Sequence, residues 1–172
     1  MDRTPHRIRV AVDVVDPAPD ARVLEIGCGP GVAMALLCER LPDGHVTGLD
    51  RSATAIARAE RRLRRHLDAG RADLQHRELT TFHGDGRPYD VVLAVDVNAF
   101  WTGPAEAAAS RLVDLLADDG VVHLLFAPPD GVDGHPAGER TVAALRHVGL
   151  DACCDVVDGV LCVTAPHRRP VG

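Results

Sequence analysis

The sequence contains no lysine and few aromatic residues, and both shortages bear on its partners. The 19 basic residues are all arginines, and against 25 acidic residues they leave a net charge of −6. Aromatic side chains make up 3% of the chain. Proteins that bind nucleic acid typically present a basic face and aromatic side chains on which bases stack. This composition therefore argues against a nucleic-acid partner.

Long apolar runs and paired cysteines are also missing. No run approaches the roughly 20 residues of a membrane-spanning helix, and the N-terminus MDRTPHRIRV has no signal-peptide core. We expect no membrane association and a cytoplasmic location. The five cysteines form no C-x-x-C pair, which favours reduced, mostly buried thiols. We expect no metal site, and we interpret the closely spaced Asp130, Asp133 and His135 as solvated.

The composition that remains is that of a globular protein. The chain has 172 residues, of which 46% are hydrophobic, and this length favours a single domain with a real core. Residues 1–20 form a short N-terminal extension. Its apolar stretch Ile8–Val15 is compatible with a helix or with an added strand.

The most informative stretch is Val23–Ala33, which reads VLEIGCGPGVA. A buried strand runs into Gly27, Gly29 and Gly31, and an apolar helix follows. Glycines at this spacing allow a tight turn and the close approach of a ligand to the backbone. The start of the helix offers unpaired N–H groups to that ligand.

Two residues of this stretch bear on the charge of the ligand. Glu25 precedes the first glycine, and a carboxylate beside a pyrophosphate would be repulsive. Val32 stands where the third glycine of a dinucleotide-binding G-x-G-x-x-G loop would be. A ligand with a cationic end suits the loop better, and S-adenosylmethionine (SAM), with its sulfonium and ammonium groups, is such a ligand.

At these residues the sequence resembles the class I (Rossmann-like) SAM-dependent methyltransferases, whose first motif is an acid followed by G-x-G-x-G. The resemblance runs from about Arg22 to about Pro128. It implies an α/β fold of three layers, with a mostly parallel seven-stranded sheet and an antiparallel terminal strand. It also implies that SAM is the cofactor, with Glu25 at its cationic end and Gly27, Cys28 and Gly29 beside it.

A second acid follows the next predicted strand. After a helix over Val32–Arg40, the strand His45–Asp50 ends in a carboxylate at the carboxyl edge of the sheet, where ligands of such folds bind. Asp50 is predicted to accept hydrogen bonds from the ribose hydroxyls, with Arg51 beside it. The alternative is that Asp50 caps the helix predicted over Ala53–Ala69, although Ser52 can do so unaided.

The Ala53–Ala69 helix carries Ile56, Ala59, Leu63 and Leu67 on one face. Its arginines therefore occupy a solvated face rather than a nucleic-acid patch. A third strand is predicted over Arg71–His76. By resemblance, Glu78 then stands where the family has an aspartate that meets the adenine amino group, and Leu79 supplies an apolar wall. Glu78 as a plain surface acid is the alternative.

The strand Tyr89–Val95 is the clearest buried strand. By resemblance, its end at Asp96 lies against the methionine part of SAM. Phe100 and Trp101 follow, either as an aromatic wall of the pocket or as packing under the next helix.

The rest of the chain predicts a mixed end to the sheet. A helix is expected from Thr102 to about Ala117, and a strand over Gly120–Phe126 contains His123, a satisfied core or interface histidine. The loop Ala127–Gly138 and the helix Glu139–Val148 follow. Leu150–Val157 and Val160–Thr164 are predicted to pair as a hairpin around Asp158 and Gly159.

The resulting hypothesis is a SAM-dependent methyltransferase that acts on a small molecule. No catalytic residue is assigned. The candidates for a general base are His83, Asp96, Asp130 and His135. A catalytically inactive SAM-binding partner module and an NAD(P)-binding oxidoreductase are the alternatives, and a homodimer is possible because the N-terminal segment is short.

Overall fold

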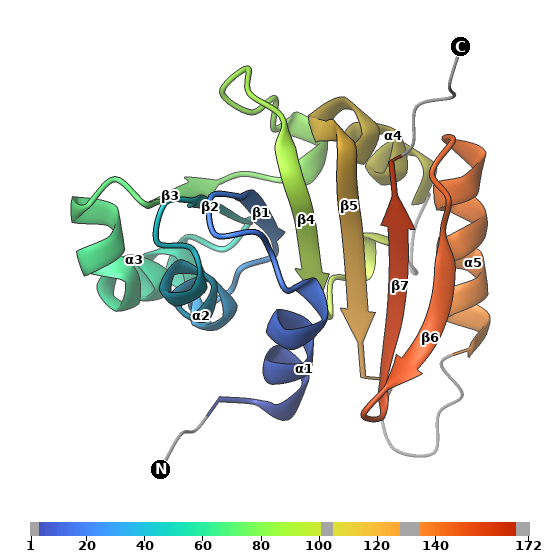
Figure 1. The fold of residues 1–172 in the computed structure, drawn as a ribbon, viewed down its shortest axis with the longest axis horizontal. Helices are drawn as coiled ribbons and strands as arrows, with labels where there is room; N and C mark the ends of the chain where they lie inside the picture. The colour runs from blue at the N-terminus through green and yellow to red at the C-terminus, as the bar shows by residue number, and fades with distance from the viewer. Residues whose placement is uncertain (1–3, 101–104, 128–134, 168–172) are drawn as a thin grey trace.

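The computed structural model describes residues 4–100, 105–127 and 135–167. Its strands form one seven-stranded sheet in the order β3-β2-β1-β4-β5-β7-β6 (Figure 1). The strands are β1 (Arg22–Ile26), β2 (His45–Asp50), β3 (Ala72–His76), β4 (Tyr89–Val95), β5 (Leu116–Phe126), β6 (Cys153–Val157) and β7 (Val160–Pro166). The α-helices are α1 (His6–Val15), α2 (Val32–Arg40), α3 (Ala53–Asp68), α4 (Ala105–Leu115) and α5 (His135–His147).

The sheet is parallel from β3 to β5, and β7 runs antiparallel to both β5 and β6. The chain turns from β6 into β7 at Asp158 and Gly159, whose φ angles of 49° and 76° are both positive. Tight hairpin turns need such angles. The predicted fold class and the terminal hairpin are therefore confirmed.

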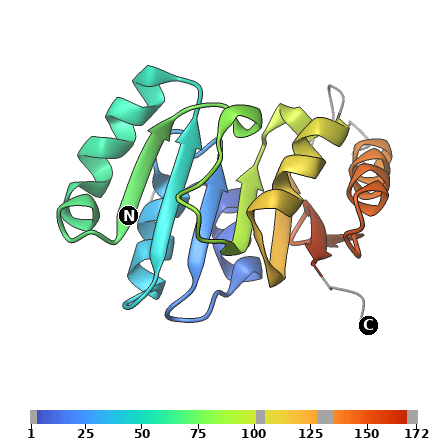
Figure 2. The same cartoon turned by 90° about the horizontal axis from the view of Figure 1, so that it is seen from above.

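Helices cover both faces of the sheet, with α3 and α5 at its two opposite ends (Figure 2). One apolar cluster joins α1, α2 and α3 to the sheet through side chains such as Val12, Leu37 and Leu63. The other joins α4 and α5 to the opposite face through Leu112 and Leu145. These two cores make the three layers expected from the sequence.

The first half of the chain matches its prediction closely. The bounds of α2, β2 and β4 are those predicted, and the open choice at the N-terminus is resolved as helix α1. In α3, Ile56, Ala59 and Leu63 are buried. The arginines at positions 58, 61, 62, 64 and 65 are exposed, as expected for a solvated face.

Two predicted boundaries are wrong. The helix α4 ends at Leu115, and Leu116 already pairs with Tyr89 in the sheet. The next paired residues are Val91 and Val121, so β5 bulges between the two pairs. The predicted strand over Gly120–Phe126 therefore misses residues 116–119, because the bulge interrupts the alternating apolar pattern there. The helix α5 begins at His135, which shortens the loop predicted over Ala127–Gly138.

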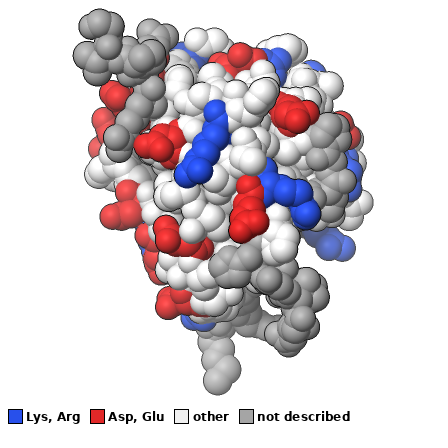
Figure 3. Space-filling model, turned by 90° about the vertical axis from the view of Figure 1, so that its right-hand side faces the viewer, with Lys and Arg blue, Asp and Glu red and all other residues white. Residues whose placement is uncertain are grey.

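The described surface carries no large patch of one charge on the side shown in Figure 3. Figure 3 looks onto the side that carries α5 and β6, where acidic and basic side chains are scattered among neutral ones. Within the described ranges, no helix has the length and apolar character needed to cross a bilayer. The absence of a nucleic-acid partner stays a prediction.

Candidate functional site

A hollow of about 440 Å³ lies at the carboxyl edge of the sheet, where β1, β2, β3 and β4 end. We call it the edge pocket. It is lined by Ile26, Gly27, Leu49, Asp50, Arg51, Arg77, Glu78, Leu79, Thr80, Val95, Asp96, Val97, Asn98, Ala99 and Ala108. Because parallel strands all end at this edge, residues far apart in the sequence meet here.

The fold brings most of the predicted cofactor residues to this one place. Those that line the edge pocket are Gly27, Asp50, Arg51, Glu78, Leu79 and Asp96. Glu25, Cys28 and Gly29 do not line it. The contacts of all nine residues with a cofactor stay predictions.

The glycine loop is shaped by its φ angles, which are +67° at Gly27, +53° at Gly29 and +74° at Gly31. A Cβ at Gly27 would lie 2.6 Å from Val97 Cγ2, which is a clash. A Cβ at Gly31 would lie 3.1 Å from Ala59 Cβ. The absent Cβ of Gly27 therefore lets the Val97 side chain pack against the loop, whereas that of Gly31 lets α2 pack closely against α3.

Asp50 joins the glycine loop to the start of α3. Its Oδ2 accepts a hydrogen bond from Gly29 N–H at 2.8 Å, and its Oδ1 accepts one from Ser52 N–H at 2.8 Å. Ser52 Oγ in turn accepts from Ala55 N–H, so Ser52 is the residue that caps α3. Each carboxylate oxygen of the half-buried Asp50 keeps accepting capacity for a ligand in the pocket.

Glu25 sits beneath the loop rather than in the pocket. Its side chain is 3% exposed, and Met34 N–H in the first turn of α2 donates to its carboxyl group. Its Oε2 has no hydrogen-bond partner. Burial, together with the smaller effect of the Asp50 charge, raises the pKa of Glu25 from 4.5 to about 8, although the hydrogen bond from Met34 N–H opposes the rise. Sequence reasoning missed this capping contact, because the pattern of an acid before glycines does not show which way the side chain turns.

Cys28 is likewise part of the support of the loop. Its backbone N–H donates to Leu49 O at 2.9 Å, and its thiol is buried. Burial raises the pKa of the Cys28 thiol. This cysteine is therefore a packing residue. Of the other cysteines, Cys38 and Cys162 are buried and Cys153 is exposed; all five are free thiols.

Asp96 connects three elements at the other side of the pocket. Its φ angle of 56° is left-handed, which is uncommon for a residue other than glycine. Its Oδ1 accepts from Ala127 N–H at 3.2 Å, just after β5, and its Oδ2 forms an ion pair with Arg7 of α1. Arg7 was missed by sequence reasoning, since no local pattern links it to a residue so distant in the chain.

Phe100 does not form a wall of the pocket. Its side chain is 1% exposed and belongs to the apolar cluster shared with α4. Of the two interpretations of the aromatic pair, packing under the next helix is therefore correct for Phe100. Trp101 lies outside the described residues.

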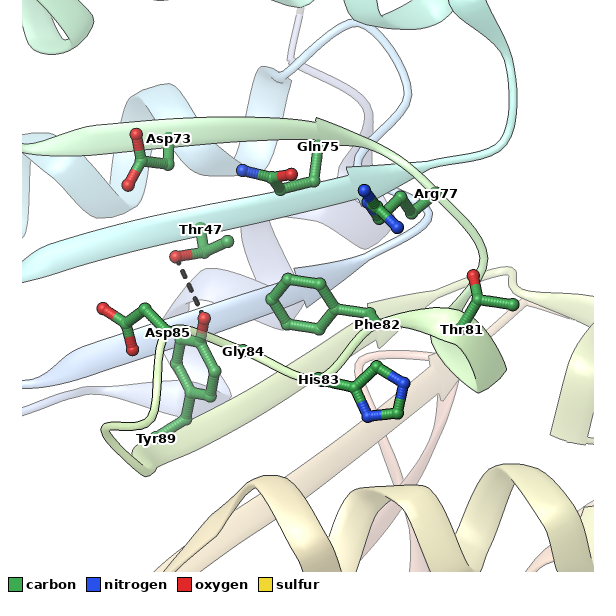
Figure 4. Close-up of a pocket in the computed structure, with 10 residues that line it drawn as sticks. All are labelled: Thr47, Asp73, Gln75, Arg77, Thr81, Phe82, His83, Gly84, Asp85 and Tyr89. Carbon is green, nitrogen blue, oxygen red and sulfur yellow. Dashed lines mark hydrogen bonds between the residues drawn. The ribbon is translucent and has the colours of Figure 1, made fainter.

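The candidate bases are scattered. His83 lines a second hollow of about 320 Å³ and contacts Arg111. In Figure 4 this hollow lies over β2 and β3, where Tyr89 O–H donates to Thr47 Oγ1 at 3.3 Å. Asp130 lies outside the described residues, and His135 begins α5. Among the described candidates, Asp96 alone lines the edge pocket.

Comparison with known proteins points in one direction. A family model described as "Methyltransferase domain" matches residues 24–122. The chain is 32% identical over 147 residues to a trans-aconitate 2-methyltransferase of Streptomyces avermitilis, covering 83% of this chain and 52% of that protein. A trans-aconitate 2-methyltransferase of Delftia acidovorans is 32% identical over 121 residues, covering 68% of this chain and 43% of that protein. The chain thus spans about half the length of the curated relatives it matches.

Solved structures share the fold at low sequence identity. A TehB-like SAM-dependent methyltransferase of Corynebacterium glutamicum gives a TM-score of 0.70 at 18% identity, covering 96% of this chain and 89% of that one. The [4+2]-cyclase SpnF gives a TM-score of 0.76 at 15% identity, covering 96% of this chain and 82% of that one. At such identities the likeness shows the fold alone.

Proposed function

Because the chain belongs to the class I SAM-dependent methyltransferases, we propose that it transfers a methyl group from SAM to a small-molecule acceptor. The observation that carries the proposal is that Gly27 and Asp50, from two motifs of this family, line the same hollow. We further propose that residues 1–172 act as one domain. The alternative of an NAD(P)-dependent oxidoreductase loses its support, because the matched family is a methyltransferase family.

The residues of the edge pocket fit SAM. Gly27 and Asp50 both line the pocket, and Asp50 offers acceptor oxygens for ribose hydroxyls. Leu79 and Glu78 would flank the adenine ring. Asp96 would lie toward the methionine part. Glu25, whose buried carboxyl group has a raised pKa, would support this site from beneath the glycine loop rather than by lining the pocket.

When bound, SAM supplies an activated methyl group: the acceptor atom forms a bond to the methyl carbon, the carbon–sulfur bond breaks, and its electron pair stays on sulfur. The protein needs no nucleophile of its own for this. The pocket residues have to hold the two reactants in line and exclude water. This positioning can lower the activation free energy by several kcal/mol. A base is needed only for an acceptor that arrives protonated.

The acceptor is proposed to be a small molecule because relatives that are 32% identical over 147 and 121 residues are named for trans-aconitate. The net charge of −6 and the 3% of aromatic residues give no support to a nucleic-acid acceptor.

Two measurements test the proposal. In separate calorimetric titrations with S-adenosylhomocysteine (SAH) and with NAD, the protein should bind SAH and should not bind NAD. Incubation with SAM and a panel of small carboxylic acids, alcohols and amines should then release SAH. Binding without release for any acceptor would favour the inactive partner module, and binding of NAD alone would contradict the proposal. Sedimentation analysis tests the possible homodimer.

A further inference from the structure

The wall of the edge pocket at the end of β4 has no positive charge of its own. It consists of Val95, Asp96, Val97, Asn98 and Ala99. The two arginines that line the pocket, Arg51 and Arg77, follow β2 and β3. Because β1 lies between β2 and β4 in the sheet, these arginines stand on the opposite side of the pocket. Any cation on the β4 side must therefore come from another element.

Helix α1 brings that cation. It packs against α2, β4 and β5, and at its first residue His6 Nε2 lies 2.9 Å from Asp158 O in the β6–β7 turn. The next residue, Arg7, pairs through Nε with Asp96 Oδ2. Asp96 is itself held by Ala127 N–H. Arg7 does not itself line the pocket, but a chain of contacts that starts at the end of β5 fixes it beside Asp96, which does.

Arg7 is not saturated by this contact. A guanidinium group has five N–H donors in a fixed plane, and the described residues offer it Asp96 as a partner at Nε. The side chain is 46% exposed, so N–H groups on the two Nη atoms remain for another anion. An arginine that is oriented by one carboxylate is well prepared to bind a second one in bidentate fashion.

The polar groups at this side also restrict the acceptor. Asp96 is the candidate base that lines the pocket among the described residues, and its two oxygens are already engaged by Ala127 N–H and Arg7. An acceptor that must lose a proton would have to compete with these two contacts for Asp96. A carboxylic acid, with an ordinary pKa of about 4, is already ionised at neutral pH and needs no base.

We propose that Arg7 binds a carboxylate group of the acceptor at the β4 side of the edge pocket and so selects anionic acceptors. Asp96 acts as the positioning residue that orients the guanidinium. The inference rests on the proposed function, because it assumes that the methyl group is presented at this side. It gives the short helix α1 a direct part in acceptor choice.

The test uses binding, with trans-aconitate as the anionic probe and its trimethyl ester as the neutral one. Each is titrated by calorimetry into protein saturated with SAH. Trans-aconitate should bind the wild type, and Arg7→Gln should weaken it about 10- to 100-fold, the scale of charge-assisted hydrogen bonds. Arg9→Gln is the matched control, because Arg9 is also exposed on α1, and it should bind like the wild type.

The affinity for SAH distinguishes a failure of this inference from a failure of the proposed function. It should stay within about twofold in both variants, which also shows that they are folded. Equal binding of trans-aconitate by wild type and Arg7→Gln would overturn the inference, as would equal binding of acid and ester. A wild type that binds SAH but binds neither trans-aconitate nor fumarate, a second and smaller anionic probe, would overturn it as well. If the wild type does not bind SAH at all, that result would instead contradict the proposed function.

Discussion

The backbone N–H of Gly29 donates a hydrogen bond of 2.8 Å to Asp50 Oδ2. This bond ties the turn after β1 to the end of β2, across the strand boundary where the edge pocket opens. Asp50 therefore shapes the loop and at the same time faces the pocket. The two acidic motifs of the sequence are thus linked directly, through the glycine loop.

Replacement of Asp50 by alanine should weaken SAH binding about 10- to 100-fold, since hydrogen bonds to a charged group contribute about 1.5–3 kcal/mol. Calorimetric titration measures this effect. Asp43→Ala, which removes an exposed acid before β2, is the control and should leave the affinity unchanged. Unchanged affinity in a folded Asp50→Ala protein would remove the ribose assignment.

Gly27→Ala should be more damaging than Gly29→Ala. Both positions have positive φ, which costs a residue with a Cβ about 1 kcal/mol or more. At Gly27 the new Cβ would also meet Val97 Cγ2 at 2.6 Å, whereas nothing lies within 4 Å at Gly29. Chemical denaturation and SAH titration should show this order, and Val97→Ala should partly rescue Gly27→Ala. The reverse order would show that the loop adopts another shape.

The buried carboxyl group of Glu25 should make the free energy of unfolding fall as the pH rises from about 4.5 to about 8. The folded pKa of about 8 lies above the ordinary 4.5, so the unfolded chain releases this proton first as the pH rises. The contribution is complete below about pH 4.5 and is lost as the pH rises through 8. Relative to Glu25→Gln, the wild type should lose on the order of 4 kcal/mol of unfolding free energy by pH 8. Parallel pH profiles of the two proteins would contradict the buried, protonated state.

His123 should act in the opposite direction. It is 8% exposed in β5, its Nδ1 lies 3.4 Å from Thr164 Oγ1, and burial lowers its pKa from 6.5 to about 4. The unfolded histidine takes up a proton below pH 6.5, while the folded one resists it until about pH 4. The wild type should therefore lose on the order of 2 kcal/mol relative to His123→Gln between pH 7.5 and pH 5. Urea denaturation at these two pH values measures the difference.

The parallel half of the fold could be predicted from the sequence because its signals are local. The glycine loop, the strand ending in Asp50 and the run Tyr89–Val95 each show their own period and their own stops. The boundary between α4 and β5 could not, because Leu116 joins the sheet through its pairing with Tyr89. The residues around Leu116 in the sequence are equally compatible with a continuing helix, so no local signal marks the boundary.

The candidate site shows the same division. Which residues reach the edge pocket follows from where each strand ends, and six of the nine predicted residues lie there. The direction of the Glu25 side chain and the approach of Arg7 to Asp96 depend on how helices pack against the sheet. Such tertiary contacts leave no periodic trace in one sequence.

The measurement that tests the central claim most directly is a crystal structure of the protein with SAH bound. The account predicts the ligand in the edge pocket, with its ribose hydroxyls on Asp50 and its homocysteine part between Gly27 and Asp96. Density for SAH in the hollow beside Thr47 and Phe82, or no density at saturating concentration, would contradict the account.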